Sequence, residues 1–201
     1  MKVEGRFKFV EVDNELVLWI KFKEGDKLAY AHFYKTYSAL LFRYGCKIST
    51  DKELVKDAIH DLFTSIWKNK ENLSVPASVK NYLVKSLRNK ILREHSKTAK
   101  FIQEESLSEL DFGLAPSNED VLVLKELDTE NKKKLLDALK SLSHKQKEVI
   151  FLLYYNNLSP AEVAAIMSVS IRTIYNTTFN AIQILKNQMA GAAILMIFYL
   201  P

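Results

Sequence analysis

Two groups of side chains in this sequence have the chemistry to bind nucleic acid. The first group combines cationic and amide side chains with an aromatic ring, and its members are Tyr82, Lys85, Arg88, Asn89 and Arg93. Lysine and arginine neutralise phosphates, and aromatic and guanidinium groups can stack on exposed bases. The second group is a donor-rich set in a later segment, and it comprises Arg172, Thr173, Tyr175 and Asn176. Donors of these types suit the polar edges of a DNA groove.

Catalytic and metal chemistry have much less support. Cys46 is the one cysteine, which excludes an internal disulfide and a thiolate zinc cluster and fits a reducing compartment. None of the four histidines (His32, His60, His95 and His144) lies at metal-ligand spacing from another. The sequence has no glycine-rich phosphate loop, no nucleophile elbow and no distinguished pair of carboxylates. We therefore expect no catalytic residue, no metal site, no cofactor and no small-molecule substrate.

A pair of short helices must position the donor-rich group. Ser159 can cap the first helix, Pro160 suits its first position, and Glu162 lies three residues after the cap. Residues 168–170 then interrupt the apolar period, and Ser170 can cap a second helix directly after them. This is the layout of a helix-turn-helix, whose second helix enters the major groove. A helical hairpin inside a core has the same spacing.

The second helix of this pair has two distinct faces. One face holds Ile174, Thr178, Ala181, Ile182 and Leu185. The other holds Arg172, Thr173, Tyr175, Asn176, Phe179 and Asn180. Upstream, Ser143 and Gln146 form another capping-box pattern, which opens a helix able to cover the pair from behind with Val149, Ile150, Leu152 and Leu153. A three-helix unit of this kind favours the helix-turn-helix.

Charge is distributed unevenly along the chain. Residues 80–100 hold seven Lys or Arg against one acid, on a helix with an apolar face of Tyr82, Leu83, Leu87, Ile91 and Leu92. Residues 101–130 hold nine acids against one lysine, together with Gly113, Pro116 and no sustained period. The acidic stretch is therefore predicted to be a linker between two helical domains.

The composition predicts a folded, all-α protein. The chain has 201 residues, of which 48% are apolar, and only five glycines and four prolines supply turn signals. The long stretches between them have helical apolar periods. The segment RFKFVEVDNELVLWIKF alternates in part, which leaves a short strand pair open there.

The two ends of the sequence argue against a membrane span. Charged residues interrupt every candidate apolar core of a secretory signal near the start. Residues 189–201 are apolar but fall short of the roughly 20 residues that span a bilayer as a helix. We expect a cytoplasmic protein whose apolar tail packs on protein, and a peripheral membrane contact or a partner's groove stays open.

Four stretches resemble the RNA polymerase sigma factors of the extracytoplasmic-function (ECF) type. They are KEGDKLAYAHFYKTYSALLFRYG (23–45), LVKDAIHDLFTSIWKNKENL (54–73), VKNYLVKSLRNKILREHSK (79–97) and SLSHKQKEVIFLLYYNNLSPAEVAAIMSVSIRTIYNTTFNAIQILK (141–186). They follow the family's order, with the acidic linker where the family has one. The resemblance implies an N-terminal extension (1–25), a region two helical bundle (26–100), an acidic linker (101–130), a region four helix-turn-helix (131–188) and an apolar tail (189–201).

The resemblance also implies partners and residue roles. Region two would bind core RNA polymerase and help melt the minus-ten promoter element, and region four would recognise the minus-thirty-five element. The polymerase-binding residues would be Asp57, His60, Asp61 and Thr64, while Phe63, Ile66 and Trp67 would serve the core. The minus-ten residues would be Tyr82, Lys85, Arg88, Asn89, Arg93 and Lys97. The minus-thirty-five residues would be Ser159, Arg172, Thr173, Tyr175 and Asn176. An anti-sigma factor is a further possible partner.

The sequence departs from the family pattern at three positions. Arg93 stands where the family usually has an aspartate, and Ser96 stands where an arginine is common. Ser168 replaces the usual turn glycine, so this serine is expected to adopt a left-handed or strained conformation at a cost of about 1 kcal/mol. The second helix of the pair also has fewer Lys and Arg than usual.

Two other functions compete with a sigma factor. A one-component regulator would bind operators through the helix-turn-helix as a dimer, and would need a ligand pocket or a symmetric interface in its first domain. A DNA-processing enzyme would want clustered carboxylates for metal ions. The basic aromatic helix beside an acid-bearing one fits melted DNA and a protein partner better than either.

Overall fold

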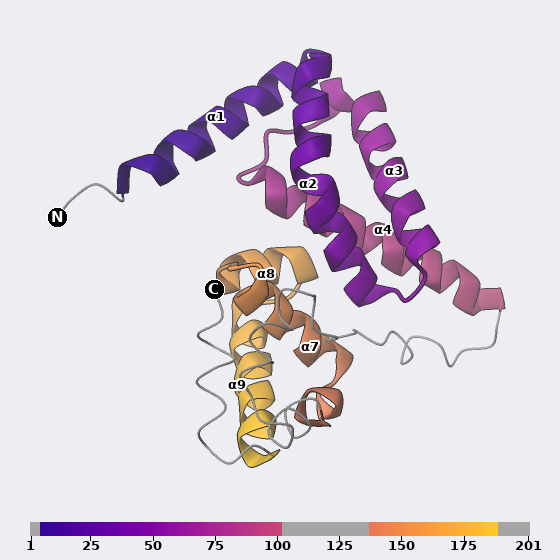
Figure 1. Cartoon of the computed structure of the whole chain (residues 1–201), viewed down its shortest axis with the longest axis vertical. Coiled ribbons are helices and arrows are strands. Elements are labelled where there is room, and N and C mark those ends of the chain that lie inside the picture. The colour runs from indigo at the N-terminus through magenta and orange to yellow at the C-terminus, as the bar shows by residue number, and fades with distance from the viewer. Residues whose placement is uncertain (1–4, 102–136, 189–201) are drawn as a thin grey trace, which may run out of the picture. The chain divides into compact units, whose positions relative to one another are not determined.

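The structure is a computed structural model that describes residues 5–101 and 137–188, with side chains from 14 to 96 and from 137 to 188 (Figure 1). These residues form helices and connecting turns without a strand, which confirms the predicted all-α fold. The chain divides into two compact units, Met1–Leu107 and Ser108–Pro201. Nearly all of the predicted linker and the whole apolar tail lie outside the described residues.

The described part of unit 1 contains four α-helices and one short 3-10 turn. The helices are α1 (Gly5–Lys23), α2 (Lys27–Ile48), α3 (Lys52–Lys68) and α4 (Val79–Phe101), and the 3-10 turn η1 spans Lys70–Asn72. Helices α2, α3 and α4 each pack against the other two, and α1 packs on α2 and α4 (Figure 1). The segment for which a strand pair was left open is therefore helical.

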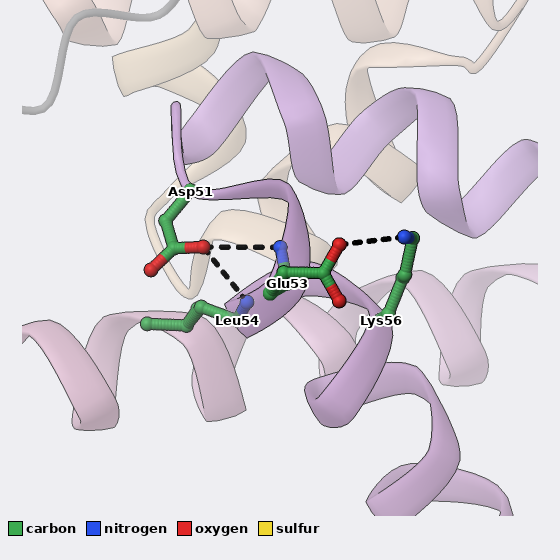
Figure 2. A network of polar contacts seen from close by, with 4 residues as sticks. All are labelled: Asp51, Glu53, Leu54 and Lys56. Carbon is green, nitrogen blue, oxygen red and sulfur yellow. Dashed lines mark hydrogen bonds and ion pairs between the residues drawn. The ribbon is translucent and has the colours of Figure 1, made fainter.

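Aspartate caps start two of these helices. The Asp26 carboxylate accepts hydrogen bonds from the first amides of α2. The Asp51 Oδ1 atom accepts from the amides of Glu53 and Leu54, each at 3.0 Å, and Glu53 pairs with Lys56 at 2.6 Å (Figure 2). Such caps satisfy amides that have no partner inside the helix, so they fix where each helix begins.

Two glycines permit the close arrangement of these helices. Gly25 has φ +93°, a left-handed conformation that lets the chain turn sharply between α1 and α2. On α2, a Cβ atom at Gly45 would lie 2.5 Å from Cγ1 of Val55. The absence of a side chain at this point therefore lets α2 and α3 approach each other.

The core of unit 1 includes the end of α1. Trp19 and Phe22 have no exposed surface. The Trp19 indole nitrogen donates to the Ser74 carbonyl at 3.1 Å, and its ring lies 5.5 Å from that of Phe33. Residues 19–22, predicted as part of an extension, thus contribute to the core that holds α2 and α4 in place.

In the described part of unit 2, three α-helices follow a helical segment at residues 137–141. They are α7 (His144–Ile150), α8 (Pro160–Met167) and α9 (Ile171–Gln188), with a π-helical turn η2 at Phe151–Tyr155. The core cluster of this unit is Ala138, Leu142, Ile150, Ala181 and Leu185. Helix α7 packs on α9, and so does α8 (Figure 1).

Candidate polymerase and nucleic-acid interfaces

Local hydrogen bonds fix the start of α8 as predicted. The Ser159 amide donates to the Glu162 carboxylate at 2.7 Å, and the Glu162 amide donates to the Ser159 hydroxyl at 3.3 Å. The α7 helix starts with the same reciprocal capping box, between Ser143 and Gln146. Both boxes were legible in the sequence because each involves residues only three positions apart.

Ser168 ends α8 in the left-handed conformation that was expected because it replaces the family's usual turn glycine. Its φ is 56° and its ψ is 45°, and the amide of Val169 donates to the Ala164 carbonyl at 3.1 Å. This conformation closes the helix and redirects the chain within three residues. A side chain in this region costs about 1–2 kcal/mol relative to right-handed geometry.

Helix α9 starts on the predicted cap and has the predicted faces. The Ser170 hydroxyl oxygen accepts from the Thr173 amide at 3.1 Å and lies 2.7 Å from the Thr173 hydroxyl. Ile174, Ala181 and Leu185 are fully buried, whereas Thr178 and Ile182 are partly buried. The α8–α9 pair is therefore a helix-turn-helix with one face in the core and the other open.

The outer face of this pair presents the candidate minus-thirty-five residues. Ser159, Arg172, Tyr175 and Asn176 are exposed, and Thr173 is half-buried by its cap. The 18 residues of α9 contain no Asp or Glu. A helix with arginine and amide donors and no carboxylate on its open face is compatible with a polyanion such as DNA.

Helix α4 separates the candidate minus-ten residues from an apolar face. Leu83, Leu87 and Ile91 are fully buried as predicted, and Val84, which the prediction missed, joins them. Lys85, Arg88 and Asn89 are half-buried and Arg93 is exposed. The described side chains thus leave the cationic group accessible along α4, whereas the side chain of Lys97 lies outside the described residues.

Tyr82 is a half-buried member of this group. Its ring meets that of Trp19 edge-on, with centroids 5.4 Å apart. Burial raises the pKa of the Tyr82 phenol, and a hydrogen bond with Ser86 opposes that rise. The core therefore holds one part of the ring, and the remainder stays accessible.

Helix α3 presents the candidate polymerase-binding residues. Asp57, His60 and Asp61 are exposed and Thr64 is half-buried. Phe63 and Ile66 are buried and Trp67 is partly buried, as expected of core residues. Positions 57, 60, 61 and 64 lie on one side of α3, which stays accessible, while the helix packs on α2 and α4.

An ion pair joins this acidic face to α4. The Lys90 ammonium lies 3.2 Å from a carboxylate oxygen of Asp61. No local sequence pattern predicts this contact of Lys90, because the pair joins residues on two different helices. The pair makes the two candidate surfaces of unit 1 neighbours.

Other kinds of site find no support in the residues that the structure describes. Within them, no group of three or more His, Cys, Asp or Glu side chains could hold a metal ion. The Cys46 thiol is half-buried, and burial raises its pKa although three nearby lysines oppose the shift. Among residues 5–101 and 137–188, no helix is both long and apolar enough to cross a membrane.

Comparison with known proteins gives a family match within unit 2 and a shared fold over both units. Residues 132–185 match the family model described as Sigma-70, region 4. The solved structure of the sigma factor RpoE, in complex with the anti-sigma factor NepR from Bartonella quintana, is similar with a TM-score of 0.57. It is 21% identical, and the match covers 79% of this chain and 95% of that one. No curated protein matches the sequence significantly.

A second solved structure shares the fold over both units. It is CnrH in complex with the cytosolic domain of CnrY, with a TM-score of 0.55 and 17% identity, covering 86% of this chain and 95% of that one. The region 4 match and this shared architecture do not favour a one-component regulator. Residues 132–185 thus match Sigma-70 region 4, and the chain shares the two-unit helical fold of these two solved structures.

Proposed function

We propose that this chain is a sigma factor, which binds core RNA polymerase and directs promoter-specific initiation by recognising promoter DNA and helping to melt it. The observation that carries this proposal is the α8–α9 helix-turn-helix, which lies in the segment matched to region 4 and whose second helix, α9, contains no Asp or Glu. The chemistry of RNA synthesis belongs to the polymerase, and we assign no reaction to this chain.

Helix α9 would enter the major groove of the minus-thirty-five element. Arg172, Thr173, Tyr175 and Asn176 occupy its first two turns, the part of a recognition helix that reaches base edges. The exposed Ser159 at the start of α8 would contact the phosphate backbone beside it. Arg172 can donate two hydrogen bonds to guanine, and Asn176 can pair with adenine.

Helix α4 would hold the melted strand of the minus-ten element. Its group comprises Tyr82, Lys85, Arg88, Asn89, Arg93 and Lys97. Cations neutralise phosphates, and the Tyr82 ring, anchored against Trp19, offers a platform for an unstacked base. Arg93 is the exposed cation of this group, so it is well placed to follow the backbone.

Helix α3 would provide the polymerase contact. Asp57, His60, Asp61 and Thr64 give an accessible, acid-bearing face, which suits a basic surface on the partner. The Asp61–Lys90 pair would fix this face relative to the DNA-binding side of α4. Polymerase binding and strand capture would then occur on one rigid unit.

Each DNA-binding surface alone should be weak. Tethering raises the effective concentration of the second surface once the first is seated, so two modest surfaces give tight binding together. We therefore expect the free chain to bind duplex promoter DNA poorly. On polymerase, binding should be tight and should fall steeply with salt, because cations displace condensed counterions.

Regulation by a protein partner is part of this proposal. The RpoE structure contains an anti-sigma factor, and the CnrH structure contains the cytosolic domain of CnrY. An anti-sigma factor that covered the exposed face of α3 would block polymerase binding. One that covered the exposed faces of α4 or α9 would block promoter binding. The cytoplasm, where polymerase and promoters are found, is the proposed location.

Reconstitution with purified bacterial core polymerase tests the proposal. The chain should co-migrate with the core enzyme and start transcripts on a subset of a promoter library. The variant Asp57→Lys, which reverses one charge on the α3 face, should co-migrate less, and Asp137→Lys in unit 2 provides an exposed charge-reversal control. Failure of the unmodified chain to co-migrate would remove the proposal.

A further inference from the structure

Three large apolar side chains are exposed along one line of α9. Ile171, Tyr175 and Phe179 keep 46%, 60% and 62% of their surface accessible. They recur every four residues, so successive members lie about 6 Å apart along the helix axis and are rotated by about 40°. We call this set the α9 stripe.

The core of unit 2 does not need these three side chains. That core is served by the opposite side of α9, where Ile174, Ala181 and Leu185 are fully buried. A run of exposed apolar side chains on a small unit marks a binding surface. Arg172 and Asn176 lie beside the stripe, so the surface is continuous with the proposed DNA contact.

The apolar side chains of the stripe match the one apolar group in the major groove of duplex DNA. In the major groove the base pairs offer hydrogen-bonding groups and one apolar group, the C5 methyl of thymine. The stripe extends over about 12 Å, which corresponds to three or four base-pair steps of about 3.4 Å. Helix α9 itself contains no Asp or Glu, so it brings no carboxylate towards the phosphates.

We infer that the α9 stripe recognises thymine methyl groups in the upstream promoter element, which makes Ile171 and Phe179 specificity residues alongside Tyr175. This inference rests on the proposed function and names the base that the surface prefers. It also accounts for a recognition helix with only two basic residues, Arg172 and Lys186. Much of its discrimination comes from apolar contact instead of charge.

Deoxyuridine gives a direct test because it differs from thymidine only by the missing methyl group. Core polymerase carrying the full chain is first used to select tight-binding duplexes from a pool that is random in the upstream element. The selected duplex is then remade with deoxyuridine at each thymine of that element in turn. Burial of one methyl predicts about fourfold weaker binding at each contacted position.

Single variants connect each methyl to a side chain. Phe179→Ala and Ile171→Ala should each bind the thymine duplex about fourfold less tightly and should be insensitive to methyl removal at one position. Leu28→Ala on α2 is the control, because Leu28 is 82% exposed and lies outside the stripe. It should retain the full methyl effect, and circular dichroism verifies that all variants are folded.

The outcomes separate this inference from the proposed function. Equal binding of thymine and deoxyuridine duplexes, or a full methyl effect in both stripe variants, overturns the inference while the proposed function stands. A methyl effect seen only after deletion of residues 189–201 also overturns it, since that segment would then be the occupant of the stripe in the full chain. If polymerase carrying the chain selects no duplex, the proposed function fails as well.

Discussion

Replacing Ser168 by glycine should stabilise unit 2 without altering unit 1. Ser168 ends α8 at φ 56° and ψ 45°, where a side chain costs about 1–2 kcal/mol and glycine does not. Glycine also loses more backbone freedom on folding, which reduces this gain in stability by about 0.5–1 kcal/mol. The net gain in the free energy of unfolding should therefore be about 0.5–1 kcal/mol. Ser168→Ala is the matched control, since it removes the hydroxyl and keeps the strain.

The two units can be followed separately in this experiment. Both tryptophans, Trp19 and Trp67, lie in unit 1, so their fluorescence during urea unfolding reports on that unit. Hydrogen exchange of the α8 and α9 amides reports on unit 2, and it should slow about two- to fivefold in Ser168→Gly. Equal slowing in Ser168→Ala would refute the assignment of strain to this residue. A matching shift in the tryptophan transition would show that the effect is not local.

Three further substitutions test the packing and the surfaces. Gly45→Ala should destabilise unit 1 by about 1–3 kcal/mol, because the new Cβ would lie 2.5 Å from Val55. Urea unfolding measures this loss, and an unchanged midpoint would contradict the close approach of α2 and α3. Ser159→Ala should cost unit 2 about 1 kcal/mol through loss of the α8 cap, measured by hydrogen exchange, and no loss would mean that the cap is dispensable. Asp61→Asn should change stability by less than about 1 kcal/mol, because the Asp61 side chain is 62% exposed, although that of Lys90 is only 29% exposed. The variant should nevertheless weaken co-migration with polymerase, and a large loss of stability would make Asp61 structural.

The parts of the fold that depend on neighbours in the chain were predictable. Caps at Ser143, Ser159 and Ser170 each involve a residue three positions away, and the buried face of α9 follows a 3.6-residue period. The left-handed conformation of Ser168 was expected from the family resemblance, because this serine stands where the family usually has a turn glycine. Local chemistry decided these features, so a single sequence contained enough information.

Features that depend on distant residues were not predictable in the same way. The partial alternation near the start allowed a strand pair as an alternative to a helix. The structure has a helix there, and its residues Trp19 and Phe22 pack in the core. The Trp19 bond to Ser74 joins residues 55 positions apart, and the Asp61–Lys90 pair joins two helices. No local sequence pattern predicts such contacts.

The π-helical turn after α7 is a further example. The Asn156 amide donates to the Phe151 carbonyl at 3.2 Å, five residues back, in a sequence of apolar residues that would suit an ordinary α-helix. Asn157 then adopts φ 50°, which asparagine tolerates better than most residues. The roles of the α3, α4 and α9 surfaces and the boundaries of the linker stay predictions.

The most direct test of the central claim compares one promoter duplex with and without polymerase. Its affinity should be measured for the free chain and for the chain on core polymerase, each at two salt concentrations. The account predicts weak binding by the free chain, and tight binding with a steep loss at the higher salt for the complex. Tight, sequence-specific binding of the duplex by the free chain would contradict it.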